Sequence, residues 1–151
     1  MSPHSSMRRR PYRTFAMVAG VGLLFFAGCS SAAPLPEALP TPAEARLGAA
    51  DDDSFTAVQL ALASLHEDLS RHYDGPWDVE YYTFPDSDAT RWSALQSLYQ
   101  NALGPGWELD ERYPGEAFDY LQKVWSNGNT AIAIALVGGE STDTLIVLSP
   151  G

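Results

Sequence analysis

The sequence has a single cysteine, Cys29, and none of the short motifs that mark common catalytic sites. One cysteine cannot form a disulfide bond within the chain, so the folded part must be stable without such cross-links. No serine lies in a Gly-x-Ser-x-Gly motif, and Gly138-Gly139 lacks the Lys-Ser or Lys-Thr of a phosphate-binding loop. The sequence therefore contains neither the hydrolase motif nor the phosphate-binding motif.

Histidine is also rare, with only His66 and His72 in the region that we expect to fold. Six residues correspond to about 240° around a helix, so these two side chains cannot bind one metal ion from the same face. The three aspartates at 51–53 are not followed by the glycine-containing loop of oxygen ligands that calcium sites use. We predict no catalytic residue, no metal and no cofactor.

Basic residues are scarce after residue 28. Four arginines (8, 9, 10 and 13) precede that point, whereas all 19 acidic residues follow it, so residues 29–151 have five basic residues and a formal charge of −14. This charge repels nucleic acid and anionic lipid headgroups, which excludes a nucleic-acid partner and direct binding to those headgroups. Solubility of an exported protein is the simpler reason for such an acidic surface.

The longest hydrophobic stretch, residues 15–29, is too short to span a bilayer comfortably, because that requires roughly 20 apolar residues. A basic flank, a short apolar segment and small residues at its end are typical of an export signal. A start at Met7 instead of Met1 would leave this signal intact. The pair Arg9-Arg10 leaves a twin-arginine signal open as an alternative.

The end of this stretch, Phe26-Ala27-Gly28-Cys29, resembles the lipobox of bacterial lipoproteins, although Phe26 replaces the more common leucine. The resemblance implies a signal peptide over residues 1–28, cleavage between Gly28 and Cys29, and a diacylglyceryl group on the Cys29 thiol. Two or more acyl chains hold a protein durably on a membrane. The alternative is an ordinary signal peptide, or an anchor helix, that happens to contain a cysteine.

We predict that residues 29–50 consist of a lipidated cysteine followed by a Pro/Ala-rich tether. Prolines at 34, 36, 40 and 42 each fix φ and remove a hydrogen-bond donor, which disfavours both helix and sheet. A brief helix over Ala43–Leu47 is compatible with this sequence. We expect one small acidic domain over residues 51–151.

Two helices are predicted in this domain. Apolar residues at spacings of three and four indicate a first helix that begins at the aspartates and ends before Gly75-Pro76. A second helix is expected from a cap at Ser87 or Asp88 to the Gly104-Pro105-Gly106 stop. The predicted buried positions are Phe55, Val58, Leu62, Leu65 and Leu69 in the first helix, and Trp92, Leu95, Leu98, Tyr99 and Leu103 in the second.

The other regular segments have the composition and alternation of strands. We predict strands over residues 78–84, 107–112, 118–126, 130–137 and 142–148, with Asn127-Gly128 forming a hairpin turn. The expected fold is α+β in the order α-β-α-β-β-β-β, with both helices on one face of a mainly antiparallel, curved sheet of about five strands. Alanines on one side of residues 130–137 would let the helices approach that face, and Trp107 should lie where helix and sheet meet.

A second resemblance concerns the domain itself. Tyr99, Leu103, Gly106-Trp107, the turn at residues 125–128 and the alternating Ile132 and Ile134 resemble a pattern in small uncharacterised bacterial lipoproteins. The resemblance implies a helix that leads into a strand meander. It implies no known activity.

Aromatic residues are the candidates for a binding surface. Trp77, Tyr81, Tyr82 and Trp125 could form a patch for a protein or glycan partner of the envelope, although core packing would also account for them. We therefore predict a membrane-anchored extracytoplasmic lipoprotein of the cell envelope that is a partner-binding module and not an enzyme.

The alternative is a small extracytoplasmic enzyme or ligand-binding domain with a cone-shaped α+β pocket. Its acid–base groups would be His72, Asp68 or Glu80. This alternative requires a concave pocket with a desolvated titratable group.

Overall fold

The computed structural model describes residues 34–48 and 52–151. In chain order, these residues form β1 (Arg46–Leu47), α1 (Asp52–Ser70), β2 (Trp77–Thr83), α2 (Arg91–Leu103), β3 (Glu108–Leu109), β4 (Glu116–Ala117), β5 (Tyr120–Asn127), β6 (Thr130–Gly138) and β7 (Asp143–Pro150). The predicted signal peptide, cleavage position Gly28 and lipidation site Cys29 lie outside the described residues. Within the described part, neither helix is long and apolar enough to cross a membrane.

The strands form one sheet in the order β1-β2-β7-β6-β5-β3, with β4 also paired to β5. Every pair is antiparallel. The predicted α+β class is therefore confirmed, as is the order of the long elements. The sheet has seven strands instead of about five because β1 and β4, two residues each, add short edge pairings that no sequence pattern indicated.

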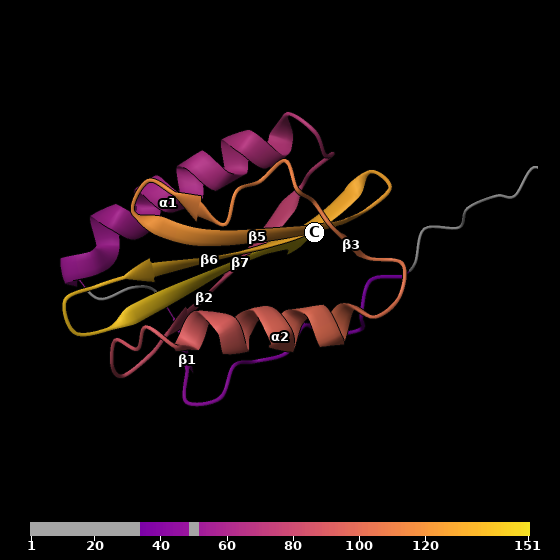
Figure 1. Ribbon diagram of the computed structural model, residues 1–151. Coiled ribbons are helices and arrows are strands. Elements are labelled where there is room, and N and C mark those ends of the chain that lie inside the picture. The colour runs from indigo at the N-terminus through magenta and orange to yellow at the C-terminus, as the bar shows by residue number, and fades with distance from the viewer. Residues whose placement is uncertain (1–33, 49–51) are drawn as a thin grey trace, which may run out of the picture. The chain divides into compact units, whose positions relative to one another are not determined.

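The two helices lie on opposite faces of the sheet, so the prediction of both on one face is wrong (Figure 1). One cluster joins α1 to the alanine face of β6, and the other joins α2 to its isoleucine face. Residues 131–137 of β6 are all buried, which means that both faces of the central strand are apolar. Each face then needs its own cover, because an uncovered apolar face would stay in contact with water.

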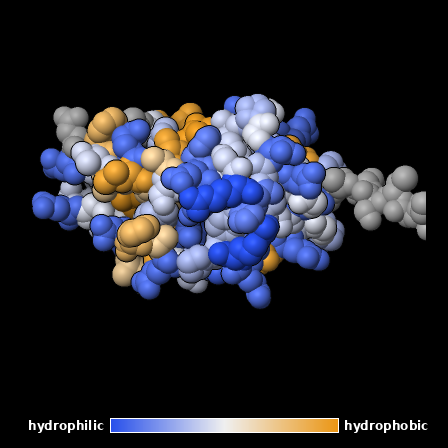
Figure 2. All heavy atoms as spheres, turned by 90° about the horizontal axis from the view of Figure 1, so that it is seen from above, coloured by the Kyte–Doolittle hydropathy of each residue, from blue (hydrophilic) through white to orange (hydrophobic). Residues whose placement is uncertain are grey.

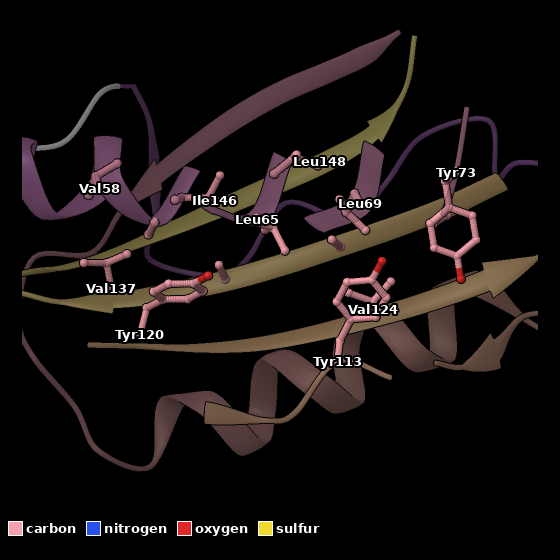
Figure 3. Close-up of a cluster of buried hydrophobic side chains, with 14 residues drawn as sticks. Val58, Leu65, Leu69, Tyr73, Tyr113, Tyr120, Val124, Val137, Ile146 and Leu148 are labelled. Atoms are coloured by element: carbon pink, nitrogen blue, oxygen red, sulfur yellow. The ribbon is translucent and has the colours of Figure 1, made fainter. Parts of the chain in front are cut away.

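Figure 3 shows the cluster beneath α1, where Val58, Leu65 and Leu69 lie over β6 and β7. Of the predicted stripe on α1, Val58, Leu65 and Leu69 are buried and Leu62 is partly buried, whereas Phe55 is 49% exposed. Small alanine side chains on this face of β6 let the α1 leucines lie close to the sheet. Trp107 is buried in the cluster on the α2 side, as expected for the junction of helix and sheet.

The predicted tether is partly built into the domain. Leu39 and Ala45 pack against the α2-side cluster, and β1 pairs with the end of β2. The Gly48 amide donates a 2.9 Å hydrogen bond to the Tyr81 carbonyl, and no helix forms over Ala43–Leu47. The backbone N–H and C=O groups at the β2 edge hydrogen-bond with this segment, and the sequence of residues 43–48 alone does not indicate that pairing.

Two boundaries differ from the prediction for local reasons. The hairpin turn has Gly128 and Asn129 as its central residues, because Asn127 pairs with Thr130. Only Gly128 takes a positive φ, +63°, which is the requirement of a type II′ turn. Helix α2 begins at Arg91, because the Ser87 hydroxyl bonds Asp143 and the Asp88 carboxylate bonds Thr90.

Candidate functional site

The structure does not bring the four predicted aromatic residues together. Tyr82 and Trp125 are 4% and 1% exposed, and both belong to the cluster on the α2 side. Trp77 and Tyr81 pack against the cluster on the other face, because neighbouring residues of a strand point to opposite sides. The Trp125 indole donates to the Gln100 side chain at 2.6 Å. These side chains fill two separate parts of the core.

The acid–base groups of the enzyme alternative do not form a buried site: His72 and Asp68 lie at the end of α1, and Glu80 lies on β2. His72 is exposed, and its ring lies edge-on to Tyr113 with the centroids 6.2 Å apart. Asp68 pairs with Arg71 at 3.3 Å, whereas Glu80, on β2, accepts a 3.0 Å hydrogen bond from the Tyr82 hydroxyl. None of the three lines either of the two hollows described below. Among the described residues, no group of three or more His, Cys, Asp or Glu side chains could hold a metal ion.

A polar cluster at the C-terminal end of α1 contains the buried residues Asp110 and Tyr73 and the half-exposed Arg112. The Arg112 guanidinium donates to both Asp110 oxygens, and the Tyr73 hydroxyl donates to the same carboxylate. These hydrogen bonds, Arg112 first, lower the pKa of Asp110 to about 2, while burial raises the pKa of Tyr73. Because every charged group already has a partner, the cluster fastens the segment after β3 to the end of α1.

A second polar cluster surrounds Asp143 at the start of β7. Its carboxylate accepts hydrogen bonds from the Ser87 hydroxyl at 2.9 Å, the Asp88 amide at 3.1 Å and the Arg91 guanidinium. The same guanidinium lies 4.2 Å from the centre of the Phe84 ring. The Asp143 carboxylate is therefore fully used in holding the loop before α2 against the sheet.

The candidate site is a groove formed by two adjoining hollows that share Phe118, Asp119 and Tyr120; we call it the Phe118 groove. One hollow, of about 580 Å³, lies between the N-terminal half of α1 and the β4–β5 turn. The other, of about 400 Å³, lies between the same turn and the loop before α2. The Phe118 groove therefore follows one edge of the domain.

Phe118 is the most unusual residue of this groove. Ala117 pairs with Tyr120, so Phe118 and Asp119 form the two-residue turn between β4 and β5. The Phe118 backbone has φ +49°, and its side chain is 95% exposed. A bulky residue at positive φ is strained by roughly 1–2 kcal/mol. Packing does not explain this strain, because the ring is almost entirely in solvent.

Two hydrophobic side chains on the N-terminal half of α1 are also exposed. Leu60 is 67% exposed and lines the larger hollow, and Phe55 is exposed on the same half of α1. Figure 2 shows hydrophobic residues gathered on the left of this face, over the N-terminal half of α1. Large exposed apolar side chains gathered on one part of a surface are typical of a surface that binds a partner.

The rim of the Phe118 groove is acidic. Asp53 and Asp119 line the larger hollow, and neither hollow is lined by a lysine or an arginine. The smaller hollow adds Asp88, Glu116 and Asp143. Arg91 pairs with Asp143 and Asp86, so it neutralises Asp143, whereas Asp53, Glu116 and Asp119 have no such partner described in this structure. A groove lined by both apolar side chains and carboxylates has the chemistry to bind a cationic, partly apolar group.

Sequence reasoning missed this groove. Leu60 lies off the buried stripe of α1, and an apolar residue on the polar face of a helix is a signal that could have indicated it. Phe118 was predicted to begin a strand. No glycine or asparagine marks residues 118 and 119 as a turn with positive φ, so the sequence carries no local signal for this conformation.

Comparisons with protein families, with curated proteins and with solved structures found no match for this chain. Its function is therefore inferred from its own residues.

Proposed function

We propose that this protein is a lipoprotein of the bacterial cell envelope, exported by residues 1–28, anchored by acyl chains on Cys29, and used as a non-enzymatic binding module outside the cytoplasm. The observation that carries the proposal is the order of signals before the domain. Four arginines, a short apolar segment and the Phe26–Cys29 lipobox-like sequence follow one another without an intervening acidic residue.

The site chemistry supports a binding role over catalysis. The buried carboxylates Asp110 and Asp143 are each held by an arginine, and of the predicted acid–base candidates His72 and Glu80 are exposed and Asp68 is only partly buried. A catalytic carboxylate needs a pocket that shields it from water but leaves it without a permanent cationic partner. The Phe118 groove instead offers exposed apolar side chains, which is what a partner-binding surface needs.

The packing of residues 39–48 against the domain supports a short link between the lipid anchor and the folded domain. Leu39, which packs on the α2 side of the sheet, lies ten positions after Cys29. Ten positions of fully extended chain span at most about 35 Å. A lipid anchor at Cys29 would therefore keep the domain near the membrane surface. The α1 wall of the Phe118 groove lies on the other face of the sheet, where a neighbouring envelope protein would be free to reach it.

Mass spectrometry of the protein made in bacteria tests this proposal. We expect an N-terminal peptide that begins at Cys29 and carries acyl chains, with the protein in the membrane fraction. Cys29→Ala should abolish acylation and leave either an uncleaved chain or one released from the membrane, whereas Ser30→Ala should keep the acylated cysteine. A full-length, unacylated chain in the soluble fraction would contradict the proposal.

A further inference from the structure

We propose that the Phe118 groove binds a basic, amphipathic polypeptide segment of another envelope protein. The apolar side chains of that segment enter the larger hollow, and its lysines and arginines meet the carboxylates of the rim. This inference rests on the proposed function only for the location of the partner, because the groove's chemistry is a property of the folded domain.

The apolar half of the argument comes from the larger hollow. Phe118 and Leu60, at 95% and 67% exposure, stand at its two sides, while Ala57, Ala61 and Val137 contribute to its wall. Large apolar side chains held in water are unfavourable, and covering them releases that free energy. The strained backbone at Phe118 keeps the ring in solvent, where a partner can contact it.

The electrostatic half of the argument comes from the negative charge of the residues around the groove. Asp53, Glu116 and Asp119 are exposed, and no hydrogen bond or ion pair described in this structure links them to a basic side chain. The whole chain after residue 28 carries a formal charge of −14, so the field around the groove attracts cations. Complementary charge of this kind guides association and fixes the orientation of a bound segment.

The same charge argues against two other occupants. A second copy of this chain would bring another −14 to the interface, and anionic lipid headgroups would meet the acidic rim directly. A helix with one apolar stripe and basic residues on its other faces satisfies both halves of the groove at once. The observations therefore favour a basic peptide segment.

A designed peptide provides the probe. We would use a synthetic helix of about 18 residues with leucines at i, i+3, i+4 and i+7 and lysines elsewhere, and a second peptide with glutamates in place of the lysines. Fluorescence anisotropy of the labelled peptides would be recorded with the acylated protein in detergent and with the full chain carrying Cys29→Ala. We expect the lysine peptide to bind at least about tenfold more tightly than the glutamate peptide.

Matched variants locate the binding. Phe118→Asn should weaken binding of the lysine peptide by about tenfold, whereas Leu109→Asn, which alters an exposed leucine away from the groove, should leave it unchanged. The pair Asp53→Asn and Asp119→Asn should weaken binding and reduce its dependence on salt. The distant pair Asp74→Asn and Glu111→Gln removes the same charge and should have little effect.

Three results would overturn the inference. The first is that the wild type and Phe118→Asn bind the lysine peptide equally tightly, and the second is that the groove pair and the distant pair of acidic substitutions weaken this binding equally. The third is that the protein binds anionic vesicles more tightly than the lysine peptide. Self-association that Phe118→Asn abolishes, measured by sedimentation, would assign the groove to a second copy. Circular dichroism of each variant checks that it is folded. If the wild type is unacylated but binds the lysine peptide, the groove proposal is supported and the lipid-anchor proposal is contradicted. If the wild type is acylated but does not bind the peptide, the anchor is supported and the groove proposal is contradicted.

Discussion

The two faces of the sheet are made by alternate residues of the same strands, yet they are closed in different ways. On the α2 side, Trp107, Trp125 and Tyr99 join the isoleucines of β6, and residues 39–48 add a further cover. On the α1 side, alanines of β6 meet the leucines of a single helix. The face with large side chains has this second cover, whereas the face with small ones carries the larger hollow of the Phe118 groove.

This difference shows how side-chain volume decides where a surface stays open. Small residues at Ala133 and Ala135 allow α1 to lie close to β6, but one helix covers only part of a sheet this wide. The edge beyond its N-terminal half is bounded by the β4–β5 turn, which holds Phe118 outward. We infer that stability is concentrated on the α2 side and binding chemistry at the edge of the α1 side.

The largest predicted effect comes from removing a large side chain on the α2 side. Trp125→Ala should lower the free energy of unfolding by about 3–5 kcal/mol, because it leaves a cavity in a fully buried site. Urea denaturation followed by circular dichroism measures the change. Gln100→Ala removes only the partner of the indole N–H and should cost about 1 kcal/mol. Comparable losses from both variants would show that this face is not held by packing.

The small-residue face should be sensitive to added volume. Ala133→Leu is expected to lower the free energy of unfolding by about 1–3 kcal/mol, because it forces α1 away from β6. Ile134→Leu, its neighbour on the opposite face, conserves volume and should cost less than about 1.5 kcal/mol. The same urea titration compares the two. A neutral Ala133→Leu would mean that α1 does not pack tightly over the alanines.

The polar cluster at the far end of α1 should make stability depend on acid. The Arg112 hydrogen bonds hold the pKa of Asp110 at about 2, below the ordinary value of 3.8. A lowered folded-state pKa contributes stability that is complete above pH 4 and is lost as the pH falls from about 4 through about 2. The loss should be on the order of 1–2 kcal/mol, because Arg112 is half exposed and screened by solvent.

Urea denaturation at a series of pH values between 5 and 2 measures this loss. Asp110→Asn should flatten the decline that belongs to the cluster, whereas Asp74→Asn, an exposed carboxylate, should leave it unchanged. An unchanged pH profile in Asp110→Asn would assign the acid sensitivity to other carboxylates.

The comparison of the two faces also marks the limit of sequence reasoning. The alternation of isoleucine and alanine over residues 130–137 predicted the strand, and apolar spacing predicted α1 and α2. The same alternation places apolar residues on both faces, which is a signal for a doubly covered sheet. Which helix covers which face depends on the crossover that brings β2 beside β7, a pairing of distant segments with no local signature.

The Phe118 groove was beyond local patterns for a different reason. A turn with positive φ is normally indicated by glycine, asparagine or aspartate at its first central position, and here that position is Phe118. Its conformation is imposed by the pairing of β4 with β5 and conflicts with the preference of the residue itself. Such conflicts are expected where function, and not folding, selects the side chain.

The smallest predicted effect tests that conflict directly. Phe118→Asn should raise the free energy of unfolding by about 0.5–1 kcal/mol, because asparagine tolerates positive φ and an exposed ring contributes little packing. Phe118→Ala keeps the unfavourable backbone and should stay within about 0.5 kcal/mol of the wild type. If both variants were destabilised by more than about 1 kcal/mol, the ring would be a packing residue. If Phe118→Asn is more stable than the wild type but binds the lysine peptide less tightly, the exposed Phe118 ring contributes to binding and lowers the stability of the fold.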